Sequence, residues 1–216
     1  MNLFNMDNPI FRMLSKMVDT VILSALWVIF SIPFFTMGAA STALYYTVHK
    51  TLRRNRGYLY SNFWSSFKSN FKQSTLMWLI LMAVYAIFGV DLYLTWQFLQ
   101  AGMQWGVMFY LFLVLILLTV VWTIYVVAYS ARFENTKKTT MKNAAAIAVV
   151  NLGWSFLILL LFLISAVIVY LIPVMIFFVP AVTTLLYDVI LERIFRKYMT
   201  EEDLAAERES DMIDMD

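Results

Sequence analysis

The sequence predicts an all-α membrane protein, a polytopic bundle of five to six transmembrane helices with an amphipathic helix on its cytoplasmic face. Of its 216 residues, 62% are hydrophobic and only 14% are charged, whereas soluble domains carry about 25% charged residues. A surface this apolar requires lipid as its solvent. The charges are also segregated, because eight of the fourteen acidic residues follow Thr200. We therefore expect one integral membrane domain over residues 1–199 and an acidic, disordered cytoplasmic tail over residues 200–216.

The first twenty residues predict a short amphipathic lead-in helix. Asn8 is a candidate cap for this helix, and Pro9 suits its first turn. An alternative is that residues 12–40 form a signal peptide, since a charged start precedes an apolar run and a Gly-Ala-Ala site. A signal anchor explains the segment better, because the sequence from Ser41 to Val48 stays largely apolar.

The first apolar segment, Thr20–Val48, is longer than the roughly 20 residues that one crossing needs. It forms either one long kinked helix or an outgoing helix, a turn at Pro33–Gly38 and a short return over Ala39–Lys50. The second arrangement is favoured because it keeps Arg12 and Lys16 on the positively charged side.

The stretch Lys50–Lys72 carries six Lys or Arg residues and no acidic residue. Aromatic residues recur in it at helical spacing, which predicts a surface helix whose aromatic face points into the membrane. The stretch supplies the candidate residues for binding anionic lipid or a cytoplasmic partner. These residues are Arg53, Arg54, Arg56, Trp64, Lys68 and Lys72.

Four further apolar segments are expected at Ser74–Tyr93, Val107–Tyr129, Ala144–Tyr170 and Leu171–Leu191. The loops between them alternate between basic loops and loops that are uncharged or acidic. Basic loops face the cytoplasm, so the alternation predicts a cytoplasmic C-terminus and a multi-pass protein of the cell membrane.

No sequence motif indicates an enzyme, a cofactor site or a nucleic-acid site. Cysteine is absent, and the only histidine, His49, has no acidic residue near it in the sequence. We therefore expect no metal site and interpret His49 as an interface residue with local hydrogen bonds, the alternative being a proton sensor. Asp188 is expected to be neutralised by Arg193 or Arg196.

Uncharged polar residues occur within the apolar segments. They are explained by interhelical hydrogen bonds of roughly 0.6 kcal/mol each, or by a path for a polar solute. The candidate residues for such an intramembrane polar path are Thr36, Ser41, Thr42, Asn151 and Ser155.

The first 80 residues carry a resemblance to a known family. The features are Asn8-Pro9, Asp19, the turn from Pro33 to Ala39, the run Thr42-Ala43-Leu44-Tyr45-Tyr46, Gly57-Tyr58, and the aromatic run from Phe63 to Phe71. In this order they resemble the YesL-like family of bacterial integral membrane proteins, whose function is unknown. Its members are often encoded beside genes for sugar uptake and polysaccharide breakdown, and the resemblance implies no reaction and no catalytic residues.

Two functional hypotheses follow from the resemblance and the polar residues. The first is a permease or an accessory component of oligosaccharide uptake, with sugar-transporter subunits or further copies of the chain as partners. The second is a membrane scaffold protein that binds anionic lipid or a cytoplasmic partner through residues 50–72.

Overall fold

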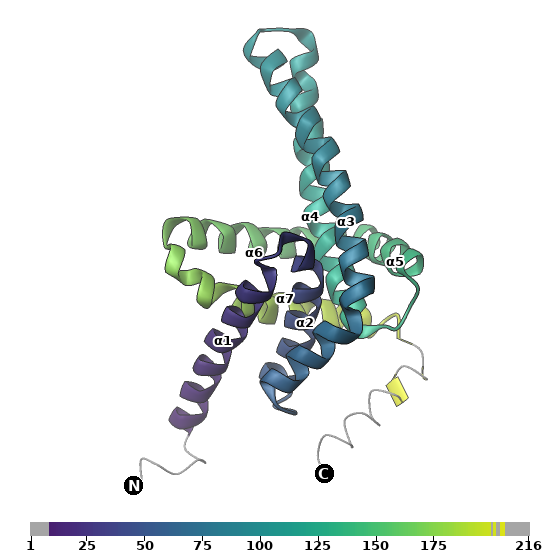
Figure 1. Ribbon diagram of the computed structural model, residues 1–216. Helices are drawn as coiled ribbons and strands as arrows, with labels where there is room; N and C mark the ends of the chain where they lie inside the picture. The colour runs from purple at the N-terminus through teal and green to yellow at the C-terminus, as the bar shows by residue number, and fades with distance from the viewer. Residues whose placement is uncertain (1–8, 200, 202–203, 206–216) are drawn as a thin grey trace.

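The computed structural model describes residues 9–199, 201 and 204–205, with side chains from residue 13 onward. Every regular element in this part of the chain is helical, as predicted (Figure 1). The α-helices are α1 (Pro9–Ser31), α2 (Met37–Thr47), α3 (Leu59–Gln100), α4 (Met108–Arg132), α5 (Lys137–Val150), α6 (Leu152–Leu171) and α7 (Val179–Phe195). Short turns of other helix types connect them: η1 (Phe34–Thr36), η2 (Val48–Arg53), η3 (Gln104–Val107) and η4 (Pro173–Phe177). Residues 1–8 of the predicted lead-in helix and most of the acidic tail lie outside the described residues.

Four helices in the described part of the chain are long and apolar enough to cross a membrane. They comprise Met13–Ser31 and Leu152–Leu171, together with Leu59–Gln100 and Gln104–Arg132, which form the α3–α4 hairpin. This supports a membrane protein but does not confirm five to six crossings. The hairpin projects beyond the other helices (Figure 1), and its far end exposes apolar side chains such as Val90, Trp105 and Val107. Such a surface suits lipid better than water.

The predicted turn after the first apolar helix is confirmed. α1 ends at Ser31 because the proline at position 33 lacks an N–H and disfavours helix at the residue before it. The hydroxyl of Thr36 donates hydrogen bonds to the carbonyl oxygens of Phe30 (2.6 Å) and Pro33 (2.7 Å), which satisfies acceptors at the end of α1. α2 then runs back beside α1 into the centre of the molecule (Figure 1).

The predicted segments after α4 are wrong in their boundaries. Asn151 separates α5 from α6, so the expected crossing Ala144–Tyr170 belongs to two helices. Asn151 favours this break because its side-chain amide donates to the Ile147 carbonyl oxygen at 2.9 Å, which competes with continued helix. The expected crossing Leu171–Leu191 is interrupted by the 3₁₀ turn at Pro173–Phe177, and α7 is not among the four candidate spans.

The predicted orientation of the amphipathic helix is also wrong. The aromatic face at the start of α3 packs against the protein, with Phe63 and Phe67 buried in a core that α1 and α2 complete. The ring of Phe30 on α1 lies 5.6 Å from that of Phe63 and 4.9 Å from that of Phe67. An amphipathic pattern shows that one face is buried but not whether lipid or protein buries it.

Candidate functional site

Five ionisable side chains from distant parts of the sequence meet in a buried charge network. His49 Nδ1 lies 2.9 Å from Asp188 Oδ1, and Arg53 donates from NH1 to Asp188 Oδ2 at 2.9 Å. On the next turn of α7, Arg132 donates from Nη2 to Glu192 Oε2 at 3.1 Å, and its Nε lies 2.6 Å from Glu192 Oε1 as part of the same ion pair. His49 Nδ1 also lies 3.6 Å from Glu192 Oε1. Both carboxylates are shielded from solvent, since Asp188 is 0% and Glu192 1% exposed.

Local backbone geometry explains why these side chains converge. α2 ends in the π-helical turn η2, which carries both His49 and Arg53 toward α7. Such wide turns are rare and occur often at functional sites. Asp188 and Glu192 are four residues apart on α7 and therefore lie on one face of it. Arg132 is the last residue of α4.

Among these five described side chains the charges cancel when His49 is neutral, because two arginines offset two carboxylates. Asp188 lies on α7, outside the four candidate spans. Burial alone raises the pKa of Asp188, but hydrogen bonds from His49 and Arg53, with the positive charge of Arg53 and of His49 when it is protonated, outweigh burial and lower that pKa. We therefore expect Asp188 to be ionised at neutral pH.

The structure corrects two expectations about these residues. His49 bonds to a residue 139 positions away instead of a local partner, and Asp188 pairs with His49 and Arg53 instead of Arg193 or Arg196. Arg193 instead lies over the Trp154 ring, 5.9 Å from its centroid.

His49, Asp188 and Glu192 also form a set of potential metal ligands, with one ligand atom from each lying within 4.8 Å of the others. His49 thus has two acidic neighbours in space although it has none nearby in the sequence. Arg53 and Arg132, however, already neutralise the two carboxylates. A divalent cation here would leave at least two uncompensated positive charges in a buried site, which is costly. The arrangement suits an ion-pair network better than a metal centre.

A large cavity lies beside this network, between α1, α2, α3, α4, α6 and α7. Its volume is about 670 Å³, which falls within the usual range for small-molecule sites. The wall is mainly apolar and aromatic, with Trp27, Trp78 and Tyr85 among its residues. Hydroxyl groups occur in bonded pairs: Tyr85 with Thr123 at 2.9 Å, and Ser165 with Thr183 at 2.6 Å.

One wall of the cavity adjoins the charge network. Tyr187 and Thr184 on α7 line the cavity, and their hydroxyl oxygens are 2.8 Å apart. The Tyr187 ring stacks on that of Tyr45, with ring centroids 6.1 Å apart and planes tilted by 9°. Tyr45 is fully buried, and its hydroxyl is in the electrostatic field of Asp188 and Glu192. The stacked rings of Tyr187 and Tyr45 thus connect the cavity wall to the buried carboxylates.

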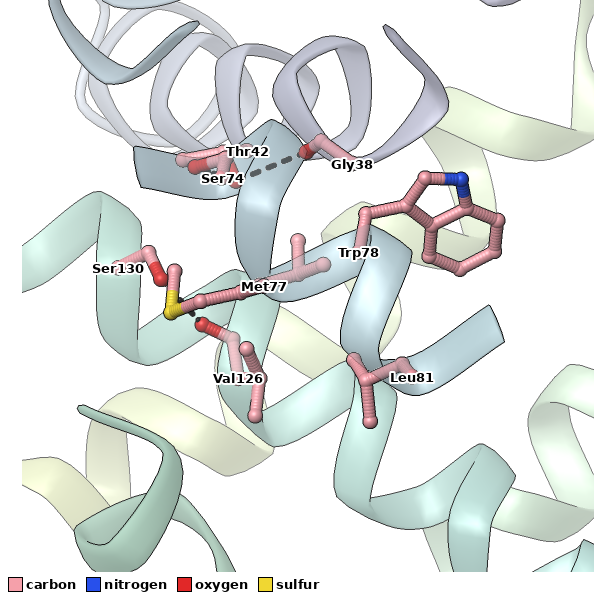
Figure 2. Close-up of a pocket in the computed structure, with 9 residues that line it drawn as sticks. Gly38, Thr42, Ser74, Met77, Trp78, Leu81, Val126 and Ser130 are labelled. Carbon is pink, nitrogen blue, oxygen red and sulfur yellow. Dashed lines mark hydrogen bonds between the residues drawn. The ribbon is translucent and has the colours of Figure 1, made fainter. Parts of the chain in front are cut away.

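A second, much smaller pocket lies where α2 crosses α3, and Figure 2 shows its lining. Its volume of about 10 Å³ is at the limit for a single water molecule. Gly38 lies there against Trp78, and an added Cβ would approach Trp78 Cβ to 2.5 Å and Ser74 O to 2.8 Å. The pocket marks a close helix crossing that needs glycine.

The five residues of the predicted polar path do not share one cavity. Ser41 lines the large cavity and accepts a hydrogen bond from Trp27 Nε1 at 3.0 Å. Thr42 lines the small pocket and donates to Gly38 O at 3.0 Å. The other three residues make hydrogen bonds outside both cavities. Thr36 bonds to the end of α1, and Asn151 bonds at the break between α5 and α6. Ser155 donates to the Tyr125 hydroxyl at 3.0 Å.

The six candidate residues of the basic stretch also separate into groups. Arg53 belongs to the charge network, and Arg54 and Arg56 lie partly buried in the turn before α3. Trp64 packs on the core that contains Phe63, and the Lys68 ammonium lies 4.8 Å from the Trp64 ring centroid. Lys68 and Lys72 are exposed on the outer face of α3.

Sequence reasoning missed both main features of the site. Nothing in the sequence pairs His49 with Asp188 or Arg132 with Glu192, because each pair joins two helices. The signal that was present is the cost of burial, since a carboxylate inside an apolar segment needs a partner. The sequence contains several basic residues that could pair with each carboxylate, and only the three-dimensional structure shows which of them do.

The fold and the site define an apolar, helical protein of membrane type with a large open cavity beside a network of buried carboxylates. Residues 20–92 match the family model described as "Protein of unknown function, DUF624", the family that includes YesL-like proteins. The matched part is about a third of the chain and contains His49 and Arg53 but not their partners on α7. Comparisons with curated proteins and with solved structures gave no match.

Proposed function

We propose that the protein is a YesL-like bacterial cell-membrane protein without enzymatic activity that takes part in oligosaccharide uptake, as a permease or as an accessory component. The observation that carries the proposal is the cavity of about 670 Å³ at the meeting point of the helices. Its tryptophan and tyrosine rings offer flat apolar faces, and its hydroxyl groups offer hydrogen bonds. Sugars present both kinds of surface, which makes them a suitable ligand class.

The proposal includes a cytoplasmic position for the charge network and the C-terminus. Two basic parts of the chain support it, since Arg53 and Arg132 both reach the last turns of α7, which is followed by the basic residues Arg196 and Lys197. Basic residues collect on the cytoplasmic side of membrane proteins. The proposed partners are sugar-transporter subunits or further copies of the chain.

Deletion of the gene and uptake of labelled plant-derived oligosaccharides test the proposal. We expect reduced uptake of at least one sugar after deletion, and unchanged uptake across the whole panel would refute the proposal. Ala166 and Val167 are neighbouring exposed residues of α6, but Ala166 lines the open cavity whereas Val167, which is 55% exposed, does not. Ala166→Trp fills the cavity and should fail to restore uptake, whereas the control Val167→Trp should restore it at equal protein levels.

A second candidate function is that of a scaffold protein binding anionic lipid or an acidic cytoplasmic partner. The observation in its favour is that the aromatic face of α3 is buried, which leaves Lys68 and Lys72 pointing outward. Each such residue contributes about 1 kcal/mol near an anionic surface. Replacing both with Gln should lower the anionic lipid that copurifies with the protein, as measured by mass spectrometry, and unchanged lipid content would argue against this function.

A further inference from the structure

We infer that His49 is the binding site for a proton that is coupled to solute binding in the cavity. The inference rests on the proposed transport function and names its driving ion. It starts from three observations on the described part of the chain. These are a buried imidazole with one nitrogen that lacks a hydrogen-bond partner there, four neighbouring charges that cancel when that imidazole is neutral, and a packing route from the network to the cavity.

The imidazole has one nitrogen in use and one without a partner. Nδ1 lies 2.9 Å from Asp188 Oδ1, and this contact fixes Nδ1 as the donor when His49 is neutral. Nε2 is then an acceptor, and it is buried without a hydrogen-bond partner among the described residues. A buried polar atom of this kind costs about 1–3 kcal/mol. Its lone pair is free to accept a proton.

Charged groups from three other segments of the chain face the imidazole. Arg53 comes from the same turn η2, Arg132 from the end of α4, and Asp188 and Glu192 from α7. The Tyr45 hydroxyl lies on the α2 side, in the field of the two carboxylates. With neutral His49 the charges of these groups cancel, and one bound proton gives the network a charge of +1. The two carboxylates at 2.9 and 3.6 Å from Nδ1 can share that charge.

The cavity and the imidazole are connected through packed rings. Tyr187 lines the cavity, stacks on Tyr45, and directly precedes Asp188 in α7. A solute that displaces Tyr187 therefore shifts either the Tyr45 ring or the Asp188 carboxylate that holds His49. By linkage, a proton on His49 and a solute in the cavity must then change each other's affinity equally.

The sequence offers a direct measurement, because His49 is the only histidine. The full chain is labelled with ¹³C,¹⁵N-histidine, placed in phospholipid nanodiscs and titrated between pH 8 and pH 5 by NMR. We expect one imidazole signal that changes reversibly from the neutral to the protonated form. A wild-type signal that stays unchanged over this range overturns the inference.

Coupling is tested in proteoliposomes that enclose a pH-sensitive dye, with xylobiose, cellobiose and raffinose as probes. We expect sugar entry to acidify the lumen in the wild type. His49→Asn keeps a donor near the Nδ1 position but does not titrate, so proton movement should fall at least tenfold. The control Lys197→Gln, on an exposed residue near the end of α7, should behave as the wild type.

The two proposals fail in different ways. Sugar entry without a change in lumen pH, or an unchanged proton signal in His49→Asn, refutes coupling and leaves transport standing. If no sugar enters, the transport proposal and the coupling role both fail, and the NMR titration alone decides whether His49 binds a proton. Should His49→Asn not fold, wild-type sugar uptake that is insensitive to a protonophore overturns the coupling.

Discussion

Replacing Asp188 with Asn tests the energetic role of the charge network most directly. The Asp188 side chain is 0% exposed and accepts from His49 Nδ1 and Arg53 NH1, each at 2.9 Å. Asn is nearly the same shape, but it has one acceptor oxygen and one amide donor. One of the two donors must therefore face another donor, and the positive charge of Arg53 loses its counter-charge.

The magnitude follows from the exposure of the two partners. Breaking a fully buried ion pair by removing one member costs about 3–5 kcal/mol. The Arg53 side chain is 32% exposed, so water compensates part of its loss, whereas His49 is 4% exposed and water cannot replace the carboxylate that faces it. We therefore expect Asp188→Asn to lower the free energy of unfolding by about 2–4 kcal/mol. For a chain of this size, that lowers the thermal midpoint by roughly 5–15 °C.

The assay is thermal unfolding of the purified protein in mild detergent, followed by intrinsic fluorescence at pH 7. Glu134→Gln serves as the control, because Glu134 is exposed after the end of α4 and should change stability by less than about 0.5 kcal/mol. A double-mutant cycle with His49→Asn should give a coupling energy of about 0.5–3 kcal/mol. An Asp188→Asn protein that unfolds within 1 °C of the wild type would refute this account of the network.

Three further predictions follow from the packing and the charges. Gly38→Ala should destabilise the protein by about 1–3 kcal/mol, because its Cβ meets Trp78 and Ser74; Gly153→Ala, with no atom within 4 Å, should be neutral or slightly stabilising in the same unfolding assay. Phe63→Ala should cost about 3–5 kcal/mol if protein buries the aromatic face of α3, whereas Tyr60→Ala, at a residue 62% exposed, should cost little; equal effects would restore the lipid-facing orientation. Because the folded-state pKa of Asp188 is lowered, its stabilisation is complete above the unfolded value of about 3.9 and is lost as the pH falls through the folded value. Acid unfolding of the wild type should therefore steepen below about pH 4, and Asp188→Asn should show a weaker pH dependence there.

The sequence predicts those parts of the fold that depend on local rules. Membrane character follows from composition, and the break before α2 follows from Pro33, whose missing N–H ends α1 at Ser31. The apolar pattern also predicts the end of the Ala144–Tyr170 segment, since α6 ends at Leu171. It does not predict the break inside this segment, because the break depends on the single residue Asn151.

The surroundings of each helix face are less accessible from sequence. Phe63 and Phe67 give the same hydrophobic pattern whether lipid or α1 covers them. In a membrane protein this ambiguity is general, because apolar residues face outward as well as inward. The apolar pattern that identifies α3 therefore does not show whether lipid or protein covers this helix. Trp64, a candidate lipid-binding residue, packs against the protein core.

The charge network shows why burial and chemistry must be considered together. His49 near a basic loop predicts an interface residue, and Asp188 near the end of a segment predicts a surface ion pair, because each is judged by its neighbours in the sequence. The π-helical turn η2 changes both interpretations by directing His49 and Arg53 into α7. It places a titratable ring where two arginines already satisfy two carboxylates. A network built only for stability would need no histidine for charge balance. The buried Nε2, which has no hydrogen-bond partner within the described part of the chain, is therefore a feature that a purely structural role leaves unexplained.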